Sequence, residues 1–230
     1  MAEPSSFAGD HRVSLSLAAF QSSLGRALRG EDTAPLRADA PGFVFTVLVR
    51  RTWCERRAVA AARPVLQLVA LEQRRRLVAD YVDAGGGLAL FLPTESEAFL
   101  PFLAARLADP SHALTICRMS MALARARSAA AGFVPPAAGA WRGRVERGRF
   151  ASLVWFHADP ALVTAALGGG GAAPLGPRTH AVLFAPGLPD FFRIASEDEA
   201  ALWESLPASC GGPAPVIARL AREGAVELPA

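Results

Sequence analysis

The chain of 230 residues contains no lysine and no asparagine, and it has only three isoleucines and one tyrosine. All 24 of its basic residues are therefore arginine. Alanine, glycine, proline and arginine take the place of the missing types, as the codon bias of a GC-rich genome would produce. The high pI of about 9.2 comes largely from arginine, which does not titrate. The net charge is only +3. This balance does not favour a nucleic-acid partner.

Long apolar runs are also missing. No stretch reaches the roughly 20 apolar residues that a membrane-spanning helix needs, so no membrane association is expected. The polar segment 1–11 does not have the pattern of a secretory signal peptide. Cys54, Cys117 and Cys210 are odd in number and far apart, which favours reduced thiols over a disulfide framework. We therefore expect a cytoplasmic protein.

No motif of a known catalytic or cofactor site is present. The four histidines form no metal-ligand pair at helical spacing, and neither a phosphate-binding loop nor a nucleophile elbow occurs. His112 and Cys117 stand five residues apart, so their side chains would leave one helix in different directions. We expect neither an enzyme nor a metal or cofactor site in this chain.

The first half of the sequence has helical patterns with short breaks. A helix is predicted over Ser14–Leu28, whereas Phe43–Val49 is apolar all round and is compatible with a helix or a strand. Thr94 and Glu97 have the spacing of a capping box ahead of a further helix. About five helices follow one another closely enough for an antiparallel bundle.

The second half alternates short apolar runs with turns. A linker is predicted over Gly132–Gly139, and a capping box of Ser196 and Glu199 begins a later helix. The predicted strands are Phe150–Phe156, Thr179–Ala185 and Phe191–Ala195. We therefore predict an α+β fold: a helical bundle over residues 1–134, followed over residues 135–230 by a small α/β module resembling a winged helix.

A cluster of arginines lies just before the first of these strands, in the segment Trp141–Arg149. If this segment is extended, Arg142 and Arg144 share one face. The segment is either a solvated basic linker or a cationic groove for an acidic peptide or, with less support, for nucleic acid. The strand Phe150–Phe156 could offer an edge to which an extended peptide adds.

Segments in both halves are similar to one family, the partner proteins of multinuclear non-heme iron-dependent oxidative enzymes. In the first half, the similar segments are Arg51–Glu55, Pro64–Leu66, Leu77–Tyr81, His112–Leu114 and Arg118–Met119. In the second half, they are His157–Pro160, Val182–Gly187 and Ala201–Trp203, which look most like the partners used in methanobactin and 3-thiaglutamate biosynthesis. The resemblance covers most of residues 14–225.

This resemblance implies a subunit that is not itself the oxidase. Such a partner forms a heterodimer with a TIM-barrel iron enzyme, which carries the iron. It holds the leader of the ribosomally made precursor of a post-translationally modified peptide (a RiPP). The small second domain is then similar to a RiPP recognition element, in which the leader adds a strand. A cysteine of the bound precursor is oxidatively modified. The apolar stretch Phe43–Val49 would be covered in the heterodimer.

The resemblance also suggests which residues make contacts. The expected peptide-binding residues are Arg142, Arg144, Arg149, Leu153, Val154 and Trp155. The expected contacts with the oxidase are His112, Arg118 and Arg125. A competing interpretation makes Leu153 and Trp155 ordinary core residues.

Two other functions remain open from the sequence. A DNA-binding regulator could use the winged-helix-like end, although its last helices carry Glu197, Asp198, Glu199 and Glu204 against Arg219 and Arg222. A helix that approaches phosphates should be more basic. A hydrolase or transferase with an unfamiliar site is the third possibility.

Overall fold

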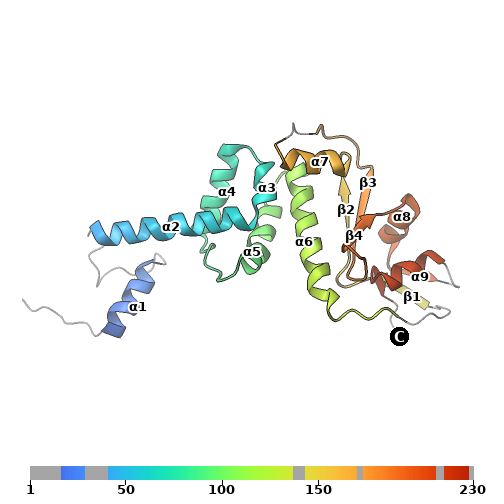
Figure 1. The fold of residues 1–230 in the computed structure, drawn as a ribbon, viewed down its shortest axis with the longest axis horizontal. Coiled ribbons are helices and arrows are strands. Elements are labelled where there is room, and N and C mark those ends of the chain that lie inside the picture. Colours follow the sequence, from blue (N-terminus) through green and yellow to red (C-terminus); the bar gives the residue numbers. More distant parts are fainter. Residues whose placement is uncertain (1–16, 29–40, 137–142, 170–172, 211–214, 228–230) are drawn as a thin grey trace, which may run out of the picture. The chain divides into compact units, whose positions relative to one another are not determined.

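A computed structural model describes residues 17–28, 41–136, 143–169, 173–210 and 215–227. Within these ranges the fold is mixed α+β and mostly helical, with nine helices and two three-stranded antiparallel sheets (Figure 1). The chain divides into two compact units, residues 1–53 and 54–230. The predicted boundary at residue 134 lies inside the second unit and stays a prediction.

The helices of the first half follow the predicted patterns with one correction. They are α1 (Leu17–Leu28), α2 (Pro41–Ala61), α3 (Arg63–Gln67), α4 (Leu71–Asp83), α5 (Leu92–Ala104) and α6 (His112–Ala130). The ambiguous stretch Phe43–Val49 is helical, as part of α2. The predicted Thr94–Glu97 capping box is wrong, because α5 already begins at Leu92 and Phe91 is its N-cap.

The second half combines short strands with three short helices. The strands are β1 (Gly143–Arg147), β2 (Ser152–Phe156), β3 (His180–Phe184), β4 (Phe192–Ile194), β5 (Ala208–Cys210) and β6 (Val226–Glu227), and the helices are α7 (Pro160–Leu167), α8 (Glu197–Ser205) and α9 (Pro215–Arg222). One sheet has the order β5-β1-β6 and the other β2-β3-β4. The three strands predicted from the sequence form the second sheet.

Local signals position two of these helices. The Asp159 side chain accepts a hydrogen bond from the Ala161 amide, and Pro160 occupies the first turn of α7. The capping box of Ser196 and Glu199 is confirmed at the start of α8, with both reciprocal hydrogen bonds present.

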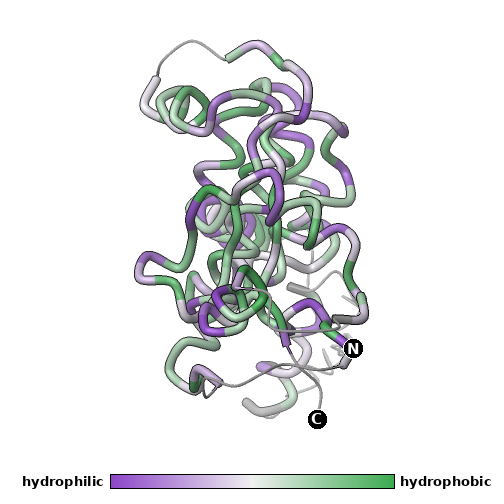
Figure 2. The backbone as a smooth tube through the Cα atoms, turned by 90° about the vertical axis from the view of Figure 1, so that its right-hand side faces the viewer, coloured by the Kyte–Doolittle hydropathy of each residue, from purple (hydrophilic) through white to green (hydrophobic). Residues whose placement is uncertain are grey.

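The central strand β3 of the β2-β3-β4 sheet is buried on both faces. Val154 and Val182 of one face belong to a core cluster with residues of α3 to α6, and α6 packs directly on β2 (Figure 1). Leu183, on the opposite face, belongs to a second cluster with β1, α8 and α9. Burial on both faces explains why β3 is apolar at four successive positions. Hydrophobic and hydrophilic stretches alternate along much of the backbone (Figure 2), as expected where most elements bury one side.

A buried carboxylate fixes the turn between α4 and α5. Glu95 is 1% exposed and accepts hydrogen bonds from the Tyr81 hydroxyl and from the amides of Gly87 and Ala89. Burial is the main reason that the pKa of Tyr81 is raised above its ordinary value, and the hydrogen bond to Glu95 adds to the effect. Gly87 has a φ of 83°, and a Cβ atom there would collide with Cys54. This network therefore has a structural role.

Candidate functional site

The strand β2 lies at an edge of its sheet, because only β3 pairs with it. On the other side of β3, the Ala195 amide donates to the Ala181 carbonyl and the Ala185 amide donates to Phe191. Odd-numbered residues of β3 therefore bond to β4, and even-numbered residues bond to β2. Val182 pairs with Val154, so the main-chain groups of Val154 bond to β3. The amides and carbonyls of its neighbours Leu153 and Trp155 therefore point away from β3.

The open part of this edge is short. The His157 carbonyl accepts a hydrogen bond from the Gly176 amide, and the Ala151 amide donates to the Gly148 carbonyl. Between these points, no backbone hydrogen bond joins Leu153 or Trp155 to another described segment on the outer side. An added strand would thus find two amides and two carbonyls, those of Leu153 and Trp155.

A hollow of about 390 Å³ adjoins this edge. Its lining comes from the start of α6, from β2 and from the segment before β3: Asp109, Pro110, Arg118, Leu153, Val154, Trp155, His157 and Arg178. The structure thus brings together all three predicted peptide-binding residues of β2 with Arg118. The role predicted for Arg118, contact with the oxidase, stays a prediction.

One wall of the hollow is an aromatic and charged cluster. The Arg178 guanidinium lies over the Trp155 ring, 4.2 Å from its centroid. The Trp155 indole donates to Glu204 of α8 at 3.0 Å, and Glu204 also forms an ion pair with Arg178. Because both side chains are held by a third, this wall is pre-organised. The Trp155 ring is only partly buried. It can therefore pack within the fold and also contact a peptide, so its two interpretations, core residue and peptide-binding residue, are compatible.

A second arginine lines the hollow from α6. The guanidinium of Arg118 on α6 forms an ion pair with Asp109 at 2.9 Å, and both side chains are more than half exposed, at 53% and 58%. Such a pair is weakly held and remains open to another partner. The lining thus contains two guanidinium groups but only one carboxylate.

The other predicted site residues lie elsewhere. Arg144 is on β1, in the other sheet, and pairs with Glu146 at 2.8 Å. The amide of Arg149 donates to Glu227, and its guanidinium lies over Phe150. Arg142 lies outside the described residues. Neither Arg144 nor Arg149 lines the hollow at the β2 edge.

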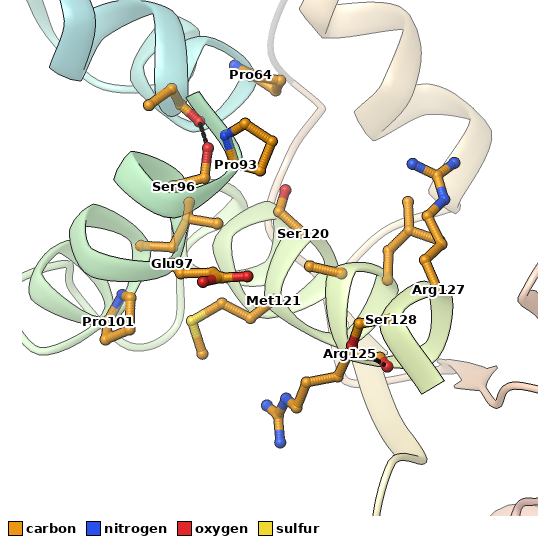
Figure 3. Close-up of a pocket in the computed structure, with 14 residues that line it drawn as sticks. Pro64, Pro93, Ser96, Glu97, Pro101, Ser120, Met121, Arg125, Arg127 and Ser128 are labelled. Carbon is orange, nitrogen blue, oxygen red and sulfur yellow. Dashed lines mark hydrogen bonds between the residues drawn. The ribbon is translucent and has the colours of Figure 1, made fainter. Parts of the chain in front are cut away.

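His112 and Arg125 adjoin two further surface hollows. The His112 Nε2 atom lies 2.8 Å from the Ala173 carbonyl, which ties the start of α6 to the segment after α7. Arg125 lines a larger hollow, about 590 Å³, between α3, α5 and α6. In Figure 3, Arg125 and Arg127 extend from opposite sides of α6, and Glu97 lies beside Met121. These charged groups do not converge on one point, as a specific ligand site requires.

Sequence reasoning missed Asp109, Pro110, His157 and Arg178 as parts of the hollow. Arg178 immediately precedes the predicted strand Thr179–Ala185, so an antiparallel pairing of that strand with β2 would have placed it near Trp155. No local signal identifies Asp109 or Pro110, because they reach the hollow only through the packing of α6 on β2.

The described residues hold no cluster of three or more histidine, cysteine, aspartate or glutamate side chains suited to a metal ion. Cys54 and Cys117 are buried thiols outside any disulfide. Burial raises the pKa of Cys117 to about 11, and its thiol donates to the Leu100 carbonyl. None of the helices in these ranges is both long and apolar enough to cross a membrane.

A comparison with known protein families gives no match, and a comparison with curated proteins gives none either. The resemblance of sequence segments to the iron-oxidase partners therefore stays a prediction.

Proposed function

We propose that this chain is a non-catalytic subunit that holds an extended precursor peptide on the edge of β2 for a separate iron-dependent oxidase. The observation that carries the proposal is the open main-chain edge at Leu153 and Trp155, next to a hollow lined by polar and aromatic side chains. Strand addition to such an edge supplies main-chain hydrogen bonds, while neighbouring side chains select the sequence. In this proposal, the iron belongs to the oxidase.

Within the proposal, the second half of the chain acts as a winged-helix-like recognition module built from the two small sheets with α8 and α9. The DNA-binding alternative receives less support from the charges. Arg219 of α9 pairs with Glu199 of α8 at 2.7 Å, so its charge is partly neutralised. A recognition helix needs cations that can reach phosphates.

The exposed part of α2 supports the need for a protein partner. Val44, Phe45 and Leu48 are 53%, 66% and 59% exposed. Large apolar side chains that cluster on one exposed helix are typical of a surface that another protein covers. We assign this segment of α2 to the contact with the oxidase.

Co-expression tests the heterodimer. The tagged chain, produced together with an iron oxidase encoded by a neighbouring gene, should purify as a stable one-to-one complex with all iron on the oxidase. Leu48→Glu should abolish co-purification, because it places a charge in the apolar contact. Leu162→Glu on α7 is the matched control, since Leu162 is equally exposed at 57% and should leave the complex intact.

The readouts are the subunit ratio by size-exclusion chromatography with light scattering and the iron content of each separated subunit. A wild-type chain that purifies alone would contradict the proposed heterodimer, and iron that remains with this chain after separation would contradict the assignment of the iron to the oxidase.

A further inference from the structure

We infer that the β2 edge selects a peptide with an acidic side chain at the position that pairs with Val154, and that Arg118 is the residue that recognises it. This inference depends on the proposed strand addition and adds the chemical class of the bound segment. It is argued from the direction of side chains along β2 and from the hydrogen-bond donors in the hollow.

Side-chain alternation places the selected residue. Val154 points to the side of the sheet covered by α6, where it belongs to the helical core cluster. In an added antiparallel strand, the residue opposite Val154 has its side chain on the same side of the sheet. That side chain would enter the hollow between β2 and the start of α6, where Arg118 and Asp109 lie.

The hydrogen-bond donors in the hollow determine the chemistry. A guanidinium has five N–H donors, and in the described structure Arg118 uses one of them in a side-chain hydrogen bond, with Asp109. Arg178, which also lines the hollow, is paired with Glu204, which itself does not line it. A peptide carboxylate can therefore bind Arg118 through charge-assisted hydrogen bonds, whereas a cationic side chain at this position would be repelled by the Arg118 guanidinium.

The neighbouring positions of the peptide face a different surface. Residues opposite Leu153 and Trp155 would have their side chains on the other side of the sheet, next to the Trp155 ring and Arg178. Because the Arg178 charge is already paired with Glu204, the partly exposed Trp155 ring on this side favours aliphatic or aromatic side chains. The expected segment thus has one acidic residue flanked by apolar or β-branched residues.

Selection from a library of random 12-residue peptides by mRNA display on the immobilised full chain tests this inference. Peptides from the selected pool are then measured by fluorescence anisotropy against the wild type, Leu153→Pro, Arg118→Gln and Arg125→Gln. Arg125 is the matched control, because it is exposed on the same helix but lines the other hollow. Arg118→Gln removes only a half-exposed ion pair, which contributes little to folding.

We expect pools enriched in aspartate or glutamate at one position. Their affinity should fall about tenfold or more in Arg118→Gln and stay unchanged in Arg125→Gln, as expected for a charge-assisted hydrogen bond. Selected peptides whose affinity falls in Leu153→Pro, but which have no acidic preference and bind Arg118→Gln as well as the wild type, would overturn this inference alone. A selection that yields no peptide sensitive to Leu153→Pro would overturn the proposed strand addition, and the inference with it.

Discussion

Replacing Glu199 by alanine should lower the free energy of unfolding by about 3 kcal/mol, because it leaves a partly buried arginine without its main partner. The Glu199 carboxylate is 3% exposed and accepts two hydrogen bonds from Arg193, at 2.6 and 2.7 Å. It also accepts one from Arg219 at 2.7 Å. The Glu199 carboxylate thus joins α8 to β4 and α9, so its loss should loosen the core cluster formed by β1, α8 and α9.

Glu197→Ala is the control, since Glu197 lies in the same helix turn but is exposed. It should cost well under 1 kcal/mol. Both variants are measured by urea unfolding at several pH values. Equal losses in the two variants would contradict the role given to Glu199.

The pH dependence gives a second readout of the same variant. The Arg193 guanidinium lowers the pKa of Glu199 from 4.5 to about 2. As pH falls below 4.5, the unfolded chain binds a proton at this residue before the folded chain does, so the contribution of Glu199 to stability decreases. The difference between the wild type and Glu199→Ala should be full at neutral pH and should shrink as the pH falls from about 4.5 toward 2.

Replacing Leu153 by proline should weaken binding of the precursor peptide about 10- to 100-fold. The substitution removes the outward-pointing amide of Leu153 and puts a ring where the added strand must lie. Losing one or two main-chain hydrogen bonds accounts for a change of this size. Because the Leu153 amide does not bond to β3, the sheet itself keeps its hydrogen bonds.

The matched control is Ile194→Pro on β4, the opposite edge of the same sheet. Ile194 pairs with Val182, whose main-chain groups bond to β2 and not to β4. The Ile194 amide therefore points away from β3, and proline at this position removes no hydrogen bond to β3. Isothermal titration with the precursor peptide should show normal affinity for Ile194→Pro. Equal weakening by both variants would mean that the peptide does not use the β2 edge.

The predictable parts of the fold are those with strong local signals. The apolar run of β3 and the capping box of Ser196 and Glu199 identify their elements without any knowledge of the rest of the chain. The strand containing Leu153, Val154 and Trp155 is confirmed for the same reason. The Thr94–Glu97 spacing failed, because Pro93 favours a helix start in the turn before Thr94.

The parts that could not be predicted depend on long-range pairing. Three of the five residues of β1 are charged, so the segment has the composition of a linker. It becomes the central strand of its sheet because β5 and β6 pair with it from more than 60 residues along the chain, with Val145 buried between them. The hollow depends in the same way on the packing of α6 against β2, which no motif encodes.

Hydrogen–deuterium exchange of the full chain, with and without the precursor peptide encoded beside it, tests the central claim most directly. Site-resolved exchange should show slower exchange at the Leu153 and Trp155 amides when the peptide is bound. The outward-facing amides of Phe192 and Ile194 on β4 should not change. Unchanged exchange at Leu153 and Trp155 in a saturated complex, or protection at β4 instead, would contradict the claim that this chain holds its peptide by strand addition to β2.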